Sequence, residues 1–172
     1  MQTVYVITTG GTIEKVYLEH TGSVQNIHAK IDRYLQKLRL PDLKVRTVRL
    51  MNKDSLEMNE ADREVVLRAV RSRLKRPAPI VITHGTDTLV ETGVFLQKNL
   101  PGLSVPIILT GAMTPLGFER SDGLQNLTES LLAARILPAG VYLVMHNQVF
   151  SIDRVRKDRE RARFVRKRAS QT

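Results

Sequence analysis

Two threonine-containing segments, each directly after a short β-branched run, hold the residues best suited to chemistry. Residues 4–13 read VYVITTGGTI, and residues 80–88 read IVITHGTDT. A threonine hydroxyl becomes a nucleophile only when a nearby base takes its proton. The bases available are a lysine, the histidine His84 and a carboxylate such as Asp87. Since the chain has no cysteine, these segments indicate attack by an oxygen or nitrogen nucleophile.

Each of these residues also has an ordinary structural interpretation. The glycine pair at 10–11 can simply turn the chain, and it lacks the further residues of a nucleotide-binding loop. Asp87 or Thr88 can cap the helix that follows. His84 can pack against the sheet with its ring hydrogen-bonded, and no partner at metal-ligand spacing accompanies it. Each turn taken alone therefore leaves structure and chemistry open.

The C-terminal segment contains a second candidate base, Lys157. Residues 153–172 hold nine Lys/Arg against three Asp/Glu, which is +6 of the formal net charge of +10. Burial beside other cations helps a lysine to lose its proton. The ordinary interpretation of the segment is a solvated, frayed end, and the alternative is a surface that follows a polyanion such as nucleic acid.

The elements that must position these residues alternate between strand and helix. Strands are predicted at 4–8, 44–49, 79–83, 105–109 and 141–145, with a further short strand near 149–150. Helical patterns cover 27–38, about 59–74 with Asn59 as N-cap, a segment ending at Leu100, and a segment that starts at Ser121 or Asp122 and ends before Pro138. This order predicts an α/β fold of three layers, a mostly parallel sheet with helices on both faces and right-handed crossovers.

Three connections are longer than is usual in a compact α/β domain: 10–26, 50–58 and 110–120. All three follow predicted strands, so they share one edge of the sheet with the turn at 84–88. Ligands of open α/β sheets bind at this carboxyl edge. We therefore expect the hydroxyls of Thr12 and Thr86 to lie in one crevice.

Taken together, the motifs resemble those of the bacterial-type L-asparaginase family. TTGGTI at 8–13 is similar to the family's first threonine motif, and VITHGTDTL at 81–89 is similar to the second. DSLEM at 54–58 resembles the substrate-carboxylate loop, with further support from TGAM at 110–113 and SDG at 121–123. Residues 149–157 parallel the segment that ends in the family's catalytic lysine. The resemblance places that lysine at Lys157.

The resemblance implies a role for each matching residue, with no metal or organic cofactor. Thr12 would attack the side-chain amide of L-asparagine, giving a β-aspartyl ester and ammonia, while N–H groups near Gly11 and Thr86 hold the oxyanion. The implied catalytic residues are Thr12, Thr86, Asp87, Lys157 and, as the nearest match to a lid tyrosine, Tyr17. The implied substrate-binding residues are Gly11, Ser55, Glu57, Thr86, Asp87 and Ala112.

The chain also departs from the family's pattern. The family usually continues into a second domain that supplies part of the neighbouring subunit's site, whereas this chain ends soon after Lys157. We expect residues 1–172 to form a single asparaginase-like N-terminal domain with a basic segment from about 153, as a short form or a fragment. A homo-oligomer with two-fold symmetry, a dimer or tetramer, would then cover the site with the 10–26 loop and the basic segment. Glu14, Lys15 and Val16 replace small residues, and Leu56 stands where a polar side chain is common.

The leading hypothesis is an amidohydrolase that converts L-asparagine to L-aspartate and ammonia, with L-glutamine as a weak substrate. One alternative is a weakly catalytic or non-catalytic module that binds nucleic acid or another polyanion through its basic segment. Another is a sensor that binds the amino acid without turnover. With no cysteine, no secretion signal and no apolar run long enough to cross a bilayer, we expect a cytoplasmic protein without a membrane partner.

Overall fold

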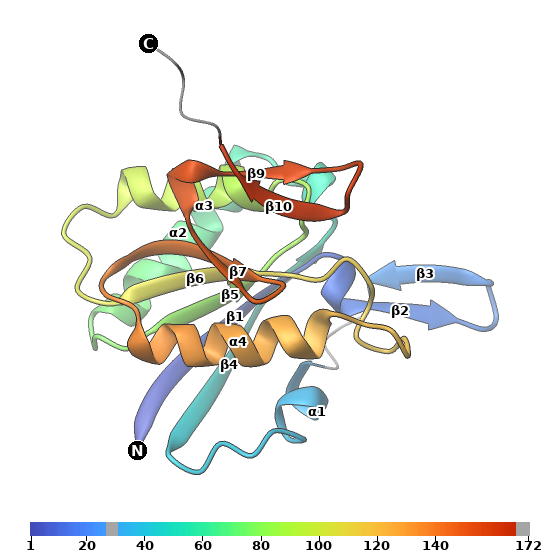
Figure 1. Ribbon diagram of the computed structural model, residues 1–172, viewed down its shortest axis with the longest axis horizontal. Helices are drawn as coiled ribbons and strands as arrows, with labels where there is room; N and C mark the ends of the chain where they lie inside the picture. Colours follow the sequence, from blue (N-terminus) through green and yellow to red (C-terminus); the bar gives the residue numbers. More distant parts are fainter. Residues whose placement is uncertain (27–30, 168–172) are drawn as a thin grey trace.

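The computed structural model describes residues 1–26 and 31–167, and a six-stranded sheet forms its middle layer (Figure 1). The strand order is β4-β1-β5-β6-β7-β8. The bounds are β1 (Gln2–Gly10), β4 (Leu43–Lys53), β5 (Ile80–Thr83), β6 (Pro106–Thr110), β7 (Gly140–Met145) and β8 (Gln148–Ser151). Five strands are parallel, and β8 pairs antiparallel with β7. All six predicted strands are present.

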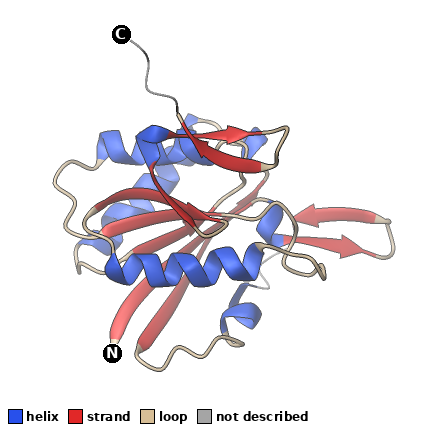
Figure 2. Cartoon of the chain, in the orientation of Figure 1, coloured by secondary structure: helices blue, strands red, loops and turns tan. Residues whose placement is uncertain are grey.

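Helices cover both faces of the sheet, which confirms the predicted three-layer α/β fold (Figure 2). On one face lie α2 (Glu60–Leu74) and α3 (Leu89–Asn99); on the other lie α1 (Ile31–Leu35) and α4 (Gly123–Ile136). Alternate strand residues point to opposite faces. In β5, Ile80 and Ile82 accordingly join the core under α2 and α3, while Val81 joins the core under α1 and α4.

The helix boundaries agree with local signals to different degrees. Asn59 caps α2 as predicted, because its side chain accepts a hydrogen bond from the N–H of Asp62 and the Asp62 carboxylate accepts one in return. The α1 helix is shorter than its predicted range: it ends at Leu35, before Leu38, and residues 27–30 lie outside the described part of the chain. The apolar spacing alone overstated the length of this helix.

One crossover has the opposite hand to the others. The steps from β5 to β6 and from β6 to β7 run in the same direction along the sheet, yet α3 and α4 lie on opposite faces. The connection through α4 therefore differs in hand from those through α1, α2 and α3. The prediction of uniformly right-handed crossovers is wrong, and the long loop before α4 consequently passes over the carboxyl edge of the sheet.

Two antiparallel hairpins were not predicted. The first, β2 (Lys15–Leu18) with β3 (Ser23–Asn26), lies within the long 10–26 connection. The second, β9 (Val155–Asp158) with β10 (Arg163–Arg166), lies within the basic segment. The interpretation of this segment as a frayed end is wrong for residues 155–166, because Val155 and Phe164 are buried in the core on the α3 side.

Within the described ranges, no helix is long and apolar enough to cross a membrane.

Candidate active site

The strand order places a topological switch point between β1 and β5. The chain leaves β1 toward β4 on one side and later returns to β5 on the other, so connections diverge at the carboxyl ends of these two neighbours. Ligands of open α/β sheets bind at such a switch point. The short helix η1 (Thr12–Glu14) follows β1, and the turn with Thr86 follows β5. The two candidate threonines thus flank the switch point, as the sequence predicted.

Three glycines allow the loops at this edge to touch. Gly11 has a φ of 81°, and a Cβ there would overlap the backbone of Gly85. A Cβ on Gly85 would lie 2.5 Å from the hydroxyl oxygen of Ser55, and one on Gly111 would overlap the carbonyl oxygen of His84. A larger side chain at any of these positions would push the loops apart. The loops after β1, β4, β5 and β6 therefore converge around the turn of β5.

Lys157 reaches this turn from the β9 strand. Its Nζ donates hydrogen bonds to the Thr86 hydroxyl at 2.7 Å and to Asp87 Oδ1 at 3.0 Å. Arg159 lies 3.4 Å from the same carboxylate oxygen. The side chains of Lys157 and Asp87 keep only 16% and 30% of their surface exposed, so solvent screens this contact incompletely. The structure thus brings together Thr86, Asp87 and Lys157.

Ser55 is held on η2 (Ser55–Glu57) with an unused hydroxyl. The residue is 1% exposed, and its Oγ has no hydrogen-bond partner within the described residues. Its carbonyl oxygen accepts a hydrogen bond of 2.8 Å from the Thr88 hydroxyl. Thr88 is the N-cap of α3 but makes no side-chain capping bond, so the capping interpretation of the β5 turn is wrong. Buried hydroxyls are normally hydrogen-bonded, so the unpaired hydroxyl marks Ser55 as a candidate for contact with a ligand.

A salt bridge joins the loop of Ser55 to that of Thr12. Lys15 Nζ lies 2.8 Å from Asp54 Oδ2, while Asp54 Oδ1 accepts the N–H of Leu56 at the start of η2. The hydrogen bond from Lys15 and that from Leu56 lower the pKa of Asp54. In the sequence, Lys15 stands out only as a departure from the family's pattern, and no local signal links it to a residue 39 positions away.

Gly11 and Ala112 belong to two of the loops that meet at this edge of the sheet. The N–H of Gly11 donates to the carbonyl oxygen of Lys53 at 2.9 Å, so this N–H is not free for the predicted oxyanion contact. Ala112 is fully buried, and the preceding carbonyl of Gly111 accepts a hydrogen bond of 2.9 Å from Asn126. Thr12 itself is half-buried.

Asp122 anchors the loop that carries Ala112. Its carboxylate accepts the N–H groups of Met113 and Thr114 at 2.9 to 3.0 Å and contacts His146 Nε2 at 2.7 Å. Although burial acts to raise it, the pKa of Asp122 is lowered by these hydrogen bonds. The sequence predicted Ser121 or Asp122 as the helix cap. Asp122 is the N-cap of α4 without a side-chain capping bond, whereas the Ser121 hydroxyl accepts the N–H of Gly123, the first residue of α4, at 3.0 Å. Apart from Asn126 on α4, the partners of the Asp122 carboxylate come from tertiary contact.

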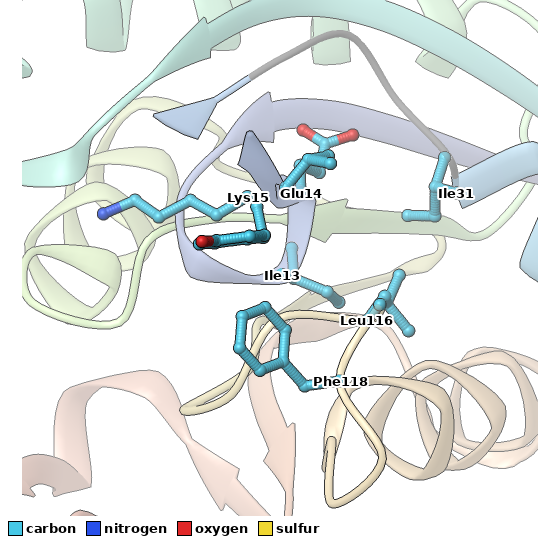
Figure 3. A pocket seen from close by; sticks show the side chains of 9 residues that line it. Ile13, Glu14, Lys15, Ile31, Leu116 and Phe118 are labelled. Atoms are coloured by element: carbon cyan, nitrogen blue, oxygen red, sulfur yellow. The ribbon is translucent and has the colours of Figure 1, made fainter. Parts of the chain in front are cut away.

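Tyr17 and Glu57 are not joined to the other candidates by any hydrogen bond in the described part of the chain. Tyr17 lies on β2 with 52% of its surface exposed, and Glu57 is exposed on η2. Tyr17 instead lines a pocket of about 170 Å³ at η1, together with Ile13, Leu116 and Phe118 (Figure 3). This pocket does not include Thr86 or Lys157.

His84 packs into the core. It is fully buried, its Nδ1 donates to the carbonyl oxygen of Gly85 at 2.8 Å, and its Nε2 accepts from the Thr92 hydroxyl at 2.9 Å. Burial lowers the pKa of His84 to about 4. The interpretation of a packed, hydrogen-bonded histidine is confirmed. No group of three or more His, Asp or Glu side chains within the described ranges is arranged to hold a metal ion.

Comparison with known proteins identifies the family. The family model described as "Asparaginase, N-terminal" matches residues 3–164. The chain belongs to the asparaginase family. It is 33% identical to the L-asparaginase of Thermococcus kodakarensis over 88% of this chain and 46% of that protein. It is 30% identical to L-asparaginase 1 of Escherichia coli strain K12 over 91% of this chain and 47% of that protein.

A solved asparaginase structure has the same fold. The thermostable L-asparaginase from Thermococcus kodakarensis superimposes with a TM-score of 0.82 at 32% identity, covering 90% of this chain and 47% of that one. The chain thus spans about half the length of the curated relatives that it matches. The asparaginase-family fold is established by these matches over nearly the whole chain.

Proposed function

We propose that the chain is an amidohydrolase that hydrolyses the side-chain amide of L-asparagine through a threonine ester. One observation carries the proposal: Lys157 Nζ contacts both Thr86 and Asp87, on the turn that the loop of Thr12 touches through Gly11 and Gly85. Hydroxyl, amine and carboxylate in contact form a path along which a proton can move.

In the first half-reaction, the Thr12 hydroxyl attacks the amide carbon while its proton passes to the relay of Thr86 and Lys157. The oxyanion accepts hydrogen bonds from the N–H groups of Thr12 and Thr86, since that of Gly11 is committed to Lys53. The carbon–nitrogen bond then breaks, and the nitrogen takes the proton and leaves as ammonia. In the second half-reaction, water attacks the ester and returns a proton to Thr12.

Substrate binding uses the polar groups that line the crevice. The Ser55 hydroxyl, buried without a protein partner, donates to the α-carboxylate of asparagine. The carboxylate of Asp87 accepts from the α-ammonium group, and the backbone at Gly11 and Ala112 completes the contact. Glu57 lies at the exposed rim, and Tyr17 belongs to a lid formed by the β2–β3 hairpin. L-Glutamine fits as a weaker substrate, because its amide lies one methylene farther from these anchors.

Ammonia release from L-asparagine tests the proposal. We expect Thr12→Ala to reduce kcat by at least about a thousandfold with the fold intact, as is usual for loss of a nucleophile. Lys157→Met should have a comparable effect. Lys167→Met is the matched control. Lys167 is exposed on the same basic segment, its ammonium group donates to the carbonyl oxygen of Asp153, and the variant should keep wild-type turnover.

Two results would contradict the proposed mechanism or the proposed activity. Retention of more than about a tenth of wild-type turnover by Thr12→Ala would exclude that residue as the nucleophile. Asparagine binding by calorimetry without ammonia release would instead identify an amino-acid sensor. The proposal includes a homo-oligomeric state and a cytoplasmic location, the latter tested by cell fractionation.

A further inference from the structure

The basic segment is a folded surface and not a loose tail. Residues 153–167 hold eight Lys/Arg against three Asp/Glu, a net charge of +5. Phe164 is 3% exposed and Val155 is fully buried, so both strands of the hairpin are anchored to the core. The turn between them is held by Asp158, whose carboxylate accepts the N–H of Arg161 at 3.2 Å. Its cations are therefore held in a defined arrangement, at a lower entropic cost to a ligand than those of a flexible tail.

The hairpin presents different chemistry on its two faces. Lys157 pairs in register with Phe164, and these two residues face the molecule. The outer face, the turn and the open end carry arginines that are all exposed: Arg154, Arg156, Arg161, Arg163 and Arg166. Within residues 1–26 and 31–167, none of these five forms an ion pair with a carboxylate. Figure 1 shows the hairpin as an outer element of the fold, and its buried residues join the core on the α3 side of the sheet. We call these five arginines the basic hairpin surface.

We propose that the basic hairpin surface binds RNA through its phosphate backbone. Guanidinium groups bind phosphate oxygens in a bidentate manner, and clusters of unpaired arginines match a polymer of phosphates better than a single anion. The single aromatic residue of this segment, Phe164, is buried, so no ring is available to stack on bases. Binding is therefore independent of base sequence.

A carboxylate within the surface favours RNA over DNA. Glu160 is exposed in the turn between Arg159 and Arg161. A carboxylate beside a phosphate backbone repels it, but it can accept a hydrogen bond from a ribose 2′-hydroxyl, which DNA lacks. The hydrogen bond from the 2′-hydroxyl thus offsets part of the repulsion between Glu160 and the phosphates, and it forms only when the bound strand is RNA.

Fluorescence anisotropy with the full chain and a labelled 20-nucleotide single-stranded RNA tests the proposal. We expect log affinity to fall linearly with log salt, losing a slope of about 0.7 for each phosphate contact. Arg161→Gln with Arg163→Gln should weaken binding about tenfold and reduce the slope by about 1.4. The matched control is Arg33→Gln with Arg39→Gln, two exposed arginines at and after α1, on the opposite face of the sheet. Thermal unfolding verifies that all variants are folded.

Four outcomes would overturn the proposal. Equal weakening by the control pair and the hairpin pair would show that only overall charge matters. Complete displacement of the RNA by polyaspartate at equal charge concentration would indicate an acidic polypeptide as the partner. Binding of DNA of the same sequence as tightly as RNA would refute the choice of RNA, and so would an unchanged difference between RNA and DNA in Glu160→Ala. These readouts do not depend on asparagine turnover.

Discussion

Glu14 and His84 are buried next to the candidate site. Burial disfavours the charged form of each side chain, so it shifts their two pKa values in opposite directions. Burial raises the pKa of Glu14 from 4.5 to about 7 and lowers that of His84 from 6.5 to about 4. As pH rises from 4.5 to 7, the unfolded chain loses the Glu14 proton before the folded chain does, so Glu14 reduces stability. As pH falls from 6.5 to 4, the unfolded chain protonates His84 first, so stability falls in the acid direction.

Because the two groups act in opposite directions, we expect their combined contribution to the free energy of unfolding to change little with pH. Removing one of them should make the free energy of unfolding depend on pH. Each pKa shift corresponds to a contribution of about 3 kcal/mol to the free energy of unfolding, and the two contributions nearly cancel between pH 4.5 and 6.5. Replacing Glu14→Gln removes one of them, so its free energy of unfolding should rise by about 3 kcal/mol between pH 4 and 6.5. Urea unfolding across this range measures the effect. Glu19→Gln, at an exposed position, is the control. A Glu14→Gln profile parallel to wild type would show that Glu14 is ionised in the folded chain.

At the scale of elements, the β9–β10 hairpin positions Lys157. Phe164 is opposite Lys157 in the hairpin register and is buried in the core. Phe164→Ala should lower the free energy of unfolding by about 3 kcal/mol, since it leaves a cavity. Turnover should fall with it, because β9 is then less firmly held against Thr86. Val165→Ala, at the half-buried neighbour, should cost about 1 kcal/mol or less and keep activity. Full turnover in a destabilised Phe164→Ala variant would contradict this positioning role.

At the scale of the whole molecule, the β2–β3 hairpin extends from the body of the fold (Figure 1). Two of its large apolar side chains are exposed. Tyr17 and Val24 are 52% and 42% exposed. A two-stranded hairpin is only marginally stable by itself in water. We therefore predict that a second copy of the chain covers it in a homo-oligomer with two-fold symmetry.

Light scattering tests this assembly at micromolar concentration. The wild-type mass should be at least twice the 19.5 kDa of one chain, and Val24→Glu should shift the population toward monomer. Ile136→Glu, at an exposed apolar position on α4, is the comparison variant and should leave the mass unchanged. A monomeric wild type would refute the prediction. Dissociation by Ile136→Glu alone would place the contact on α4.

The sequence by itself determined those features that depend on neighbours along the chain. The β-branched runs define β1 and β5, Asn59 defines the start of α2, and parallel strands place Thr12 and Thr86 at one edge. The packing of His84 was also predictable, because a lone histidine after a buried strand has little access to water. The choice of Lys157 among the basic residues came from the family resemblance, since spacing alone did not distinguish it.

Only the tertiary structure decided the contacts between distant residues. Lys157 and Thr86 are 71 positions apart, and their hydrogen bond depends on a hairpin whose strands of four residues have no strong periodicity. The commitment of the Gly11 N–H to Lys53 likewise depends on how two strands end side by side. These contacts form because burial removes apolar side chains from water and requires buried polar groups to be hydrogen-bonded. The local sequence does not show which distant residues will meet these two requirements.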